Sequence, residues 1–354
     1  MYPALSVLAK LPRESVELLW VGSEDGMEAE LVQREGISYR AVPAAGVHGV
    51  GLRTLPKNLV KLARGVLASR KILREFKPDA MFFTGGYVAV PMAVAGWNIP
   101  SVLYVPDIEP GLALKALAWF ADKITVSAPT SSAYFSRPER IVTTGYPLRS
   151  DLGNWQKDAA RTELGLEVDK PVLLVFGGSK GARSINNAVL AHLPQLLEQT
   201  QIVHITGKLD YETVINARNA LGQNHPKGRR QAEGYRVFDY VHEMGIPLAA
   251  ADLVISRAGA SSLGEFPFFG LPAILVPYPY AWRYQKVNAE YLSERNAALL
   301  VKDEDLEEQV VSLVYGLLQN PKKLDEMRTA MNALAAPYAA KKIAAELLAF
   351  SKKR

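Results

Sequence analysis

The stretch that decides the fold is Pro171-Val172-Leu173-Leu174-Val175-Phe176-Gly177-Gly178-Ser179-Lys180-Gly181-Ala182-Arg183. An apolar run long enough for a buried strand ends in glycines, and a helical pattern follows them. The same order returns about eighty residues later, in Ala251-Asp252-Leu253-Val254-Ile255 and then Ser256-Arg257-Ala258-Gly259-Ala260-Ser261-Ser262-Leu263-Gly264-Glu265. Two such junctions put free backbone N–H groups and positive helix ends at one sheet edge, which suits a diphosphate. With Glu265 placed for ribose hydroxyls, the pattern predicts a nucleotide-diphosphate site.

Composition narrows the class of protein. A length of 354 residues predicts two domains, and 49% hydrophobic with 22% charged residues is typical of globular chains. The absence of cysteine excludes disulfides, a thiol nucleophile and thiolate metal sites. No apolar run approaches the length that spans a bilayer. The five histidines match no metal spacing and no Asp-x-Asp pair ends a strand, so we expect no bound metal, and we expect no nucleic-acid partner.

Strand and helix patterns alternate along the whole chain, which predicts an α/β fold with parallel sheets. The expected strands are 16–21, 39–42, 80–83, 101–104, 123–126, 140–143, 172–175, 202–206, 235–238, 253–256 and 273–277, before a helix-rich tail from residue 305. We place the domain boundary near residues 148–156 and expect domains 1–150 and 151–354. The last helix either stays with the second domain or packs back on the first. We expect two doubly wound domains facing across a cleft, with ligands at the carboxyl ends of the strands.

The beginning of the chain departs from this scheme. Residues 1–9 read as the first turns of a helix, with Pro3 near its start. A doubly wound domain normally opens with a strand in the middle of its sheet. Either this domain is built differently or the sequence lacks its natural beginning, and we favour a missing beginning.

The positive charge is concentrated in residues 50–77. Eight bases against one acid, Glu75, give this segment +7, so the rest of the chain sums to −2 within a total of +5. Apolar residues are interleaved at spacings that suit an amphipathic helix. One reading is a face that lies on an anionic membrane surface, and the other is a docked helix with a solvated basic side. The bases are Arg53, Lys57, Lys61, Arg64, Arg70, Lys71, Arg74 and Lys77.

Taken together, these motifs resemble the MurG-type glycosyltransferases of glycosyltransferase family 28, over nearly the whole chain. The resemblance is carried by segments 177–183, 256–265, 270–273, 84–88, 145–149, 206–208 and 285–289. It implies the GT-B fold and transfer of N-acetylglucosamine from UDP to the undecaprenyl-pyrophosphoryl-muramoyl-pentapeptide lipid of peptidoglycan synthesis. It also implies a bacterial protein, peripheral on the cytoplasmic face of the cell membrane, with residues 50–77 as its membrane face.

The resemblance also assigns residues, position by position. Ser179 would bond a phosphate, Val241 the uracil edge, Glu265 the ribose and Gln285 the sugar hydroxyls, while Arg149 would approach the diphosphate. The implied donor-binding residues are Gly178, Ser179, Val241, Gly259, Ala260, Glu265, Gln285 and Arg149, and the acceptor-side residues are Gly85, Gly86, Tyr87 and Asp107. The catalytic base stays unknown, because the family's first glycine-rich loop and its histidine would lie before Met1.

The implied reaction is an inverting displacement at the anomeric carbon, without a cofactor or a tightly bound metal. Each assignment has a structural alternative: Glu265 as a helix N-terminal carboxylate, Arg149 as a surface residue, Tyr87 as packing, Ser179 as a cap and the glycines as turn residues.

The sequence also departs from the family pattern at three places, which are Tyr104-Val105-Pro106-Asp107, Tyr146 and Tyr280-Ala281-Trp282-Arg283-Tyr284-Gln285. Two alternative functions therefore stay open. One is a related UDP-sugar transferase acting on another lipid or small-molecule acceptor, and the other is a non-catalytic UDP-sugar binding protein.

Overall fold

The computed structural model describes residues 1–24, 28–46, 51, 53–178, 181–224, 226–280 and 284–351. The chain divides into two compact units. The first unit comprises Met1–Pro147 and Tyr338–Arg354, and the second comprises Leu148–Pro337. The units differ from the expected domains in residues 148–150, which belong to the second unit. Of the two placements left open for the last helix, the structure has the second, since residues 338–354 belong to the first unit. The last helix, α16 (Ala339–Ser351), lies in the first unit because it buries Ile343 and Leu347 beside α1 and β4.

The second unit is built on one six-stranded sheet, and every strand pair in it is parallel. Its strands are β7 (Val172–Phe176), β8 (Gln201–Ile205), β9 (Tyr235–Phe238), β10 (Leu253–Ser256), β11 (Ala273–Leu275) and β12 (Ala298–Leu300). The five strands expected from the sequence are confirmed to within two residues. The sixth, β12, was not expected, although the run Ala297–Val301 is apolar.

The strand order of this sheet is β12-β11-β10-β7-β8-β9. The chain starts at β7, adds β8 and β9 on one side, and then crosses to add β10, β11 and β12 on the other. The order therefore reverses between β7 and β10, and the crevice at the carboxyl ends of these two strands is where doubly wound sheets bind ligands.

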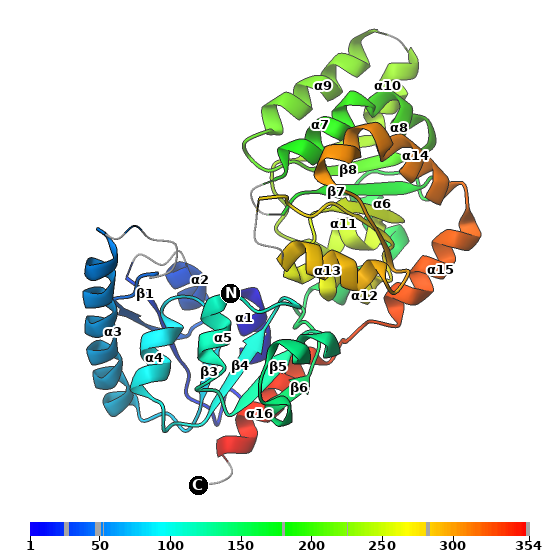
Figure 1. The fold of residues 1–354 in the computed structure, drawn as a ribbon. Helices are drawn as coiled ribbons and strands as arrows, with labels where there is room; N and C mark the ends of the chain where they lie inside the picture. Colours follow the sequence, from blue (N-terminus) through cyan, green and yellow to red (C-terminus); the bar gives the residue numbers. More distant parts are fainter. Residues whose placement is uncertain are drawn as a thin grey trace. The chain divides into compact units, whose positions relative to one another are not determined.

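Helices cover both faces of this sheet (Figure 1). The helices α7, α8 and α14 bury one face through a core that includes Ile185, Leu196 and Val314, and α11 and α12 lie on the other. The helices of the second unit are α6 (Lys157–Glu163), α7 (Arg183–Ala191), α8 (Leu193–Gln199), α9 (Tyr211–Asn224), α10 (Pro226–Glu233), α11 (Gly245–Ala250), α12 (Glu265–Phe269), α13 (Tyr284–Ser293), α14 (Leu306–Leu318) and α15 (Pro321–Asn332).

The first unit contains two parallel sheets. One pairs β1 (Leu19–Ser23) with β2 (Ser38–Val42). The other has the order β3-β4-β5-β6, from β3 (Met81–Phe83), β4 (Ser101–Val105), β5 (Lys123–Val126) and β6 (Ile141–Thr143). All six strands were expected, with β1 displaced by two to three residues toward the C-terminus. The helices are α1 (Tyr2–Leu8), α2 (Glu28–Arg34), α3 (Leu55–Phe76), α4 (Ala89–Ala95), α5 (Leu112–Leu117) and α16.

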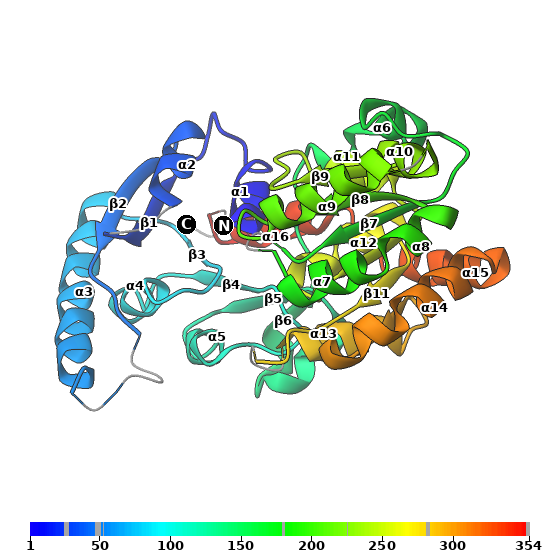
Figure 2. The ribbon, with the colours of Figure 1, turned by 90° about the horizontal axis from the view of Figure 1, so that it is seen from above.

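The four-stranded sheet is covered on both faces (Figure 2). Met81, Leu103 and Val126 face a core shared with α4 and α5. Val102 and Tyr104 face a second core shared with α1 and α16. Of the helices in the described ranges, none combines the length and the apolar character that crossing a membrane requires.

A buried polar chain fixes the end of β8 in the second unit. The side chains of His204 and Tyr235 are fully buried, and Tyr235 Oη lies 2.8 Å from His204 Nδ1. His204 Nε2 lies 2.9 Å from Asn186 Oδ1, and the Asn186 amide donates to the carbonyl of Thr206 and to Asp210. Because the Asn186 amide nitrogen is used as a donor, its oxygen accepts from His204, and the imidazole is neutral with Nδ1 as an acceptor. Burial lowers the pKa of His204 to about 3.

We predict that His204 makes folding sensitive to acid. Below its ordinary pKa of 6.5 the unfolded imidazole binds a proton that the folded one rejects until about pH 3, so stability is lost as the pH falls through this window. Between pH 7.5 and 5.5 the stability advantage of the wild type over His204→Gln should shrink by about 1.4 kcal/mol. Urea unfolding of both proteins measures it. Glu265 changes stability in the opposite direction in this pH range, but it is present in both proteins, so its effect cancels when they are compared. The same difference in free energy of unfolding at pH 7.5 and pH 5.5 would contradict the prediction.

Candidate functional site: a two-loop cradle at the strand-order reversal

Two glycine loops leave the sheet side by side where the strand order reverses. In the ladder between β7 and β10, Phe176 pairs with Ser256, and these are the last residues of their strands. Gly177 and Arg257 therefore begin their loops on neighbouring strands, about 4.8 Å apart across the sheet. The sequence prediction that both glycine motifs meet at one edge is confirmed by this register.

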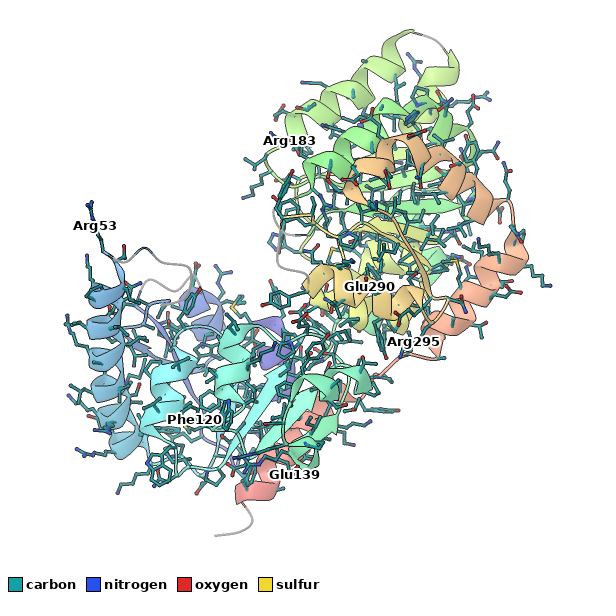
Figure 3. All side chains as sticks on the ribbon, in the orientation of Figure 1. Arg53, Phe120, Glu139, Arg183, Glu290 and Arg295 are labelled. Carbon is teal, nitrogen blue, oxygen red and sulfur yellow. The ribbon has the colours of Figure 1, made fainter. Side chains whose placement is uncertain are left out.

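The first loop, residues 177–182, needs glycine for steric reasons. A Cβ at Gly177 would come within 2.3 Å of the Ala182 nitrogen, and one at Gly181 within 2.1 Å of the Thr206 carbonyl oxygen. Gly178 has a φ of +91° and open space beside it. The α7 helix starts at Arg183, which Figure 3 labels, and none of the described side chains caps its N-terminus. Among the described residues, therefore, no capping side chain competes with a ligand for the first N–H groups of α7. Ser179 lies outside the described residues, and its phosphate contact stays a prediction.

The second loop, residues 257–264, is held by hydrogen bonds from side chains and has open space beside Gly259. Asn288 is fully buried and donates from Nδ2 to the Ala258 carbonyl at 3.1 Å. The Ser262 hydroxyl donates to the Gly259 carbonyl at 2.6 Å. A Cβ at Gly259 would meet no atom within 4 Å, so the space beside this residue is free. Ala260, half-buried, begins the short 3-10 turn Ala260–Leu263. The loop is therefore a fixed backbone surface with room for a ligand at Gly259.

Glu265 is the first residue of α12, and it brings a carboxylate to the end of the second loop. Burial raises its pKa to about 7, against the opposing effects of the Arg149 charge and a hydrogen bond from Ser261. A carboxylate with this pKa changes charge near neutral pH. It is suited to accept two hydroxyl donors when ionised, which is the role expected for it.

Arg149 and the loop after β9 lie at the same edge. The Arg149 guanidinium donates from Nη1 to the His242 carbonyl at 3.1 Å, and its Nε lies 3.8 Å from Asp151 Oδ1. Val241, expected at the uracil edge, is half-buried and precedes His242. The Arg149 charge opposes the raised pKa of Glu265, so Arg149 lies near Glu265 as well as near His242. Three expected donor-side residues, Arg149, Val241 and Glu265, therefore come together within the second unit.

No role was predicted from the sequence for the cluster of Arg257, Ser184 and Asp303, which connects the start of α7 with the second loop. Arg257 is 8% exposed and donates from Nη1 to the Val276 carbonyl at 3.0 Å and from Nη2 to the Ser184 hydroxyl at 2.7 Å. It also pairs with Asp303, which accepts from Ser184 at 2.7 Å. The guanidinium lies 5.3 Å from the centre of the Tyr278 ring. Arg257 therefore ties the start of α7 to the segment after β11. The only sequence signal was a basic residue directly after a buried strand.

The side chain of Gln285, which is expected to contact the sugar, already makes one hydrogen bond within the protein. Its Oε1 accepts from the Tyr278 backbone N–H at 2.9 Å, which leaves the amide nitrogen as the group for a ligand. Residues 281–283, which belong to the donor-sugar segment of the sequence prediction, lie outside the described residues.

The acceptor-side residues collect at one edge of the four-stranded sheet in the first unit. Gly85 and Gly86 follow β3 with φ of +101° and +87°, and Asp107 follows the neighbouring β4. Tyr87 is 58% exposed. The Asp107 charge, after burial and Tyr146, contributes to the raised pKa of Tyr104. The resemblance assigns these four residues to the acceptor side, and they follow two neighbouring parallel strands; the assignment itself stays a prediction.

Groups of three or more His, Asp or Glu side chains that could hold a metal ion do not occur among the residues that the structure describes. His48 and His225 are not among those residues.

The fold and the two-loop cradle define a class of protein, the two-unit α/β proteins that bind a nucleotide at a strand-order reversal. Residues 1–126 match the glycosyltransferase family 28 N-terminal domain, and residues 172–343 match the glycosyltransferase family 28 C-terminal domain. The chain belongs to glycosyltransferase family 28.

Relatives with assigned names cover nearly the whole chain. The chain is 37% identical to a UDP-N-acetylglucosamine–N-acetylmuramyl-(pentapeptide) pyrophosphoryl-undecaprenol N-acetylglucosamine transferase of Roseiflexus sp., covering 97% of this chain and 91% of that protein. It is 38% identical to the transferase of the same name from Desulfitobacterium hafniense, covering 97% and 94%. The crystal structure of Acinetobacter baumannii MurG has the same fold, with a TM-score of 0.75, 23% identity and coverage of 98% and 95%. The GT-B fold implied by the resemblance is thereby confirmed.

We predict that Arg257→Lys destabilises the second unit. Lysine lacks the planar fork, so the Val276 carbonyl and the Ser184 hydroxyl cannot both keep a donor, and the free energy of unfolding should fall by about 1–3 kcal/mol. The control is Arg328→Lys in the exposed pair with Asp325, expected to change stability by less than about 0.5 kcal/mol. Urea unfolding measures both. Equal stability of the two variants would mean that the cluster does not brace the loops.

Proposed function

We propose that this protein is an inverting transferase that moves N-acetylglucosamine from UDP to the undecaprenyl-pyrophosphoryl-muramoyl-pentapeptide lipid of peptidoglycan synthesis. The observation that carries the proposal is the pair of glycine loops at the strand-order reversal, with Glu265 beside them. The names of the relatives from Roseiflexus and Desulfitobacterium supply the donor and the acceptor.

The donor would lie along the edge of the second unit. Backbone N–H groups at Gly178, Gly259 and the start of α7 suit the diphosphate, because they are donors that no L side chain crowds. Glu265 would accept from the ribose hydroxyls. Val241 would meet the uracil through its backbone, and the Gln285 amide would donate to the sugar. Ser179 would add a phosphate contact, and Ala260 leaves room beside the nucleotide.

In this reaction the acceptor hydroxyl attacks the anomeric carbon while the bond to the UDP oxygen breaks on the opposite face. Negative charge builds on the leaving diphosphate. The helix N-terminus of α7 and the guanidinium of Arg149 would stabilise that charge, which is the role that preorganised donors play in catalysis. Because the donors come from the protein, the reaction as proposed uses no cofactor and no tightly bound metal.

The acceptor would use the first unit. The backbone N–H groups of Gly85 and Gly86, which have positive φ, would bind the acceptor diphosphate, and the Asp107 carboxylate would accept from a hydroxyl donor. The exposed ring of Tyr87 adds an apolar surface next to them. The base that takes the proton of the attacking hydroxyl stays unassigned.

The helix α3 would hold the protein on the membrane that carries this acceptor. Leu59, Val60 and Leu67 are 52%, 61% and 65% exposed on its surface. Exposed bases lie on the same helix, and Arg53 projects just ahead of its first turn (Figure 3). Apolar residues among bases are the composition of a helix that inserts shallowly into an anionic surface. We propose a peripheral location on the cytoplasmic face of a bacterial cell membrane, through residues 50–77.

We predict that Glu265 sets both the strength and the pH dependence of donor binding. Glu265→Ala should weaken UDP binding by about 1–3 kcal/mol, because the ribose loses its acceptor. With a pKa near 7, the wild-type carboxylate loses its charge as the pH falls, so UDP binding should weaken about tenfold between pH 8 and pH 6. Isothermal titration calorimetry measures both effects, together with transfer of labelled N-acetylglucosamine to the lipid acceptor.

The outcomes separate the proposed activity from its alternatives. Glu326→Gln, on the exposed side of α15, is the control and should leave UDP binding unchanged. Unchanged UDP affinity in Glu265→Ala would remove the donor-site assignment. UDP binding without transfer to any lipid or small-molecule acceptor would favour a binding protein, and transfer to a different acceptor would favour a related enzyme.

We predict that the double variant Val60→Asp with Leu67→Asp loses membrane binding but keeps its fold. Both side chains are exposed, so the changes remove surface apolar area and add negative charge. Partitioning to phosphatidylglycerol vesicles should fall at least about tenfold, and salt should weaken wild-type binding. The matched control places the same charges at Val168 and Leu209, which are 40% and 79% exposed in the second unit. Full vesicle binding by the α3 variant would refute the assignment.

A further inference from the structure

A lysine and a buried carboxylate form an ion pair at the acceptor-side edge of the first unit. Glu109 follows Asp107 in the loop after β4, and its side chain is only 8% exposed. Lys115 lies on α5, and its Nζ is 3.7 Å from Glu109 Oε1. A buried carboxylate is costly unless a positive charge or hydrogen-bond donors lie near it. Glu109 therefore favours a lysine head group at this place.

The Lys115 ammonium is held in place but keeps its donors. Its Nζ also lies 5.6 Å from the centre of the Tyr134 ring, a distance at which the ring face attracts a cation. The 3.7 Å to Glu109 is longer than a hydrogen bond, and none of the hydrogen bonds in the described part of the chain uses this ammonium. The side chain is 40% exposed. Its N–H donors are therefore left for a ligand.

The helix that carries Lys115 borders the glycine turn after β3. A Cβ at Gly85 would lie 3.2 Å from Leu114 Cδ2, so the turn and α5 are in contact. The helix also packs against α4 and β4, which fixes it beside this edge of the sheet (Figure 1). Leu114 directly precedes Lys115. The long and flexible lysine side chain thus starts from the helical turn next to Gly85 and Gly86.

The charges of this edge leave Lys115 a single role. The segments that form it are residues 84–88, 106–117 and 127–134, and in them Asp107 and Glu109 are the only acids and Lys115 is the only base. A diphosphate brings further negative charge to these carboxylates, which repel it. Within these segments, only the Lys115 charge can offset that repulsion.

We propose that Lys115 binds the diphosphate of the acceptor lipid from the side of α5, opposite the backbone N–H groups of Gly85 and Gly86. Glu109 holds the ammonium near the site, and the phosphate oxygens receive charge-assisted hydrogen bonds from it. This inference rests on the proposed function, which puts the acceptor diphosphate at Gly85 and Gly86, and it adds the residue that supplies the positive charge.

The test uses geranyl diphosphate, a soluble prenyl diphosphate, and isothermal titration calorimetry in the presence of EDTA. Lys115→Met should weaken binding at least about tenfold, because the charged donor is lost. Lys115→Arg keeps a positive charge and should retain most of the affinity. The matched control is Lys302→Met, which changes an exposed lysine 3.8 Å from Glu304 in the second unit and should bind geranyl diphosphate like the wild type.

Two measurements separate a lost contact from a damaged fold. Lys115→Met leaves Glu109 buried without its ion-pair partner, so the double variant Lys115→Met with Glu109→Gln removes both charges. Binding by the double variant should stay well below that of the wild type, and wild-type affinity in it would overturn the proposal. UDP should bind equally to the wild type and to Lys115→Met. A matching loss of UDP affinity would show that Lys115 does not serve the acceptor alone and would also overturn it.

The chemistry of the ligand is tested in the same way. Geranyl monophosphate should bind more weakly than the diphosphate, and equal affinity for both would overturn the assignment to a diphosphate. Binding that requires magnesium and is the same in Lys115→Met would assign the positive charge to a metal ion instead, and would overturn the role of Lys115.

A transfer assay separates this inference from the proposed function. In Lys115→Met the KM for the lipid acceptor should rise at least about tenfold, whereas the KM for UDP-N-acetylglucosamine should not change. Normal transfer by a wild type that binds geranyl diphosphate without help from Lys115, or not at all, would overturn the inference and leave the proposed function intact. Lys115-dependent binding by a wild type that transfers no sugar would support the site and contradict the proposed function.

Discussion

The candidate site depends on the in-register pairing of β7 with β10. Because Phe176 and Ser256 are the last paired residues, two loops eighty positions apart in the chain start from adjacent strands. The helix α7 follows the first loop, and the second loop leads through the turn Ala260–Leu263 into α12. A slip of one residue would exchange the side chains of β7 and β10 between the two faces of the sheet and displace the loops. Both strands are buried on both faces, so the slip would place side chains of the wrong size in two packed cores. Core packing and the position of the loops therefore have the same cause.

Buried polar side chains hold the loop that begins at Arg257 in place. Arg257, Asn288 and His204 are 8%, 0% and 0% exposed, and each uses its hydrogen-bonding atoms on backbone or on other buried side chains. A buried group without a partner costs more than a made bond returns, so these contacts allow few alternatives. The second loop, residues 257–264, is therefore held in place by the protein itself. Preorganised donors are worth more to a charged ligand than donors that must first be ordered.

The sequence predicted what local patterns encode. Apolar runs predicted eleven of the twelve strands, and glycines at strand ends predicted the loops, because only glycine tolerates the contacts seen at Gly177 and Gly181. The missed strand, β12, has three residues, too few for a periodicity. The partner of Arg257 could not be found from the sequence, since Asp303 lies 46 positions away. Likewise the sequence predicted a last helix but left open on which unit it packs.

The two units use glycines at strand ends in the same way. In the second unit the central strand β7 is followed by the first glycine loop, and β10 by the second. In the first unit Gly85 and Gly86 follow β3 with positive φ, and the neighbouring parallel strand β4 leads to Asp107. The carboxyl ends of parallel strands meet at one edge of a sheet, so each unit collects its glycine turns and polar side chains at such an edge. One local pattern, an apolar strand followed by glycines, therefore builds both edges.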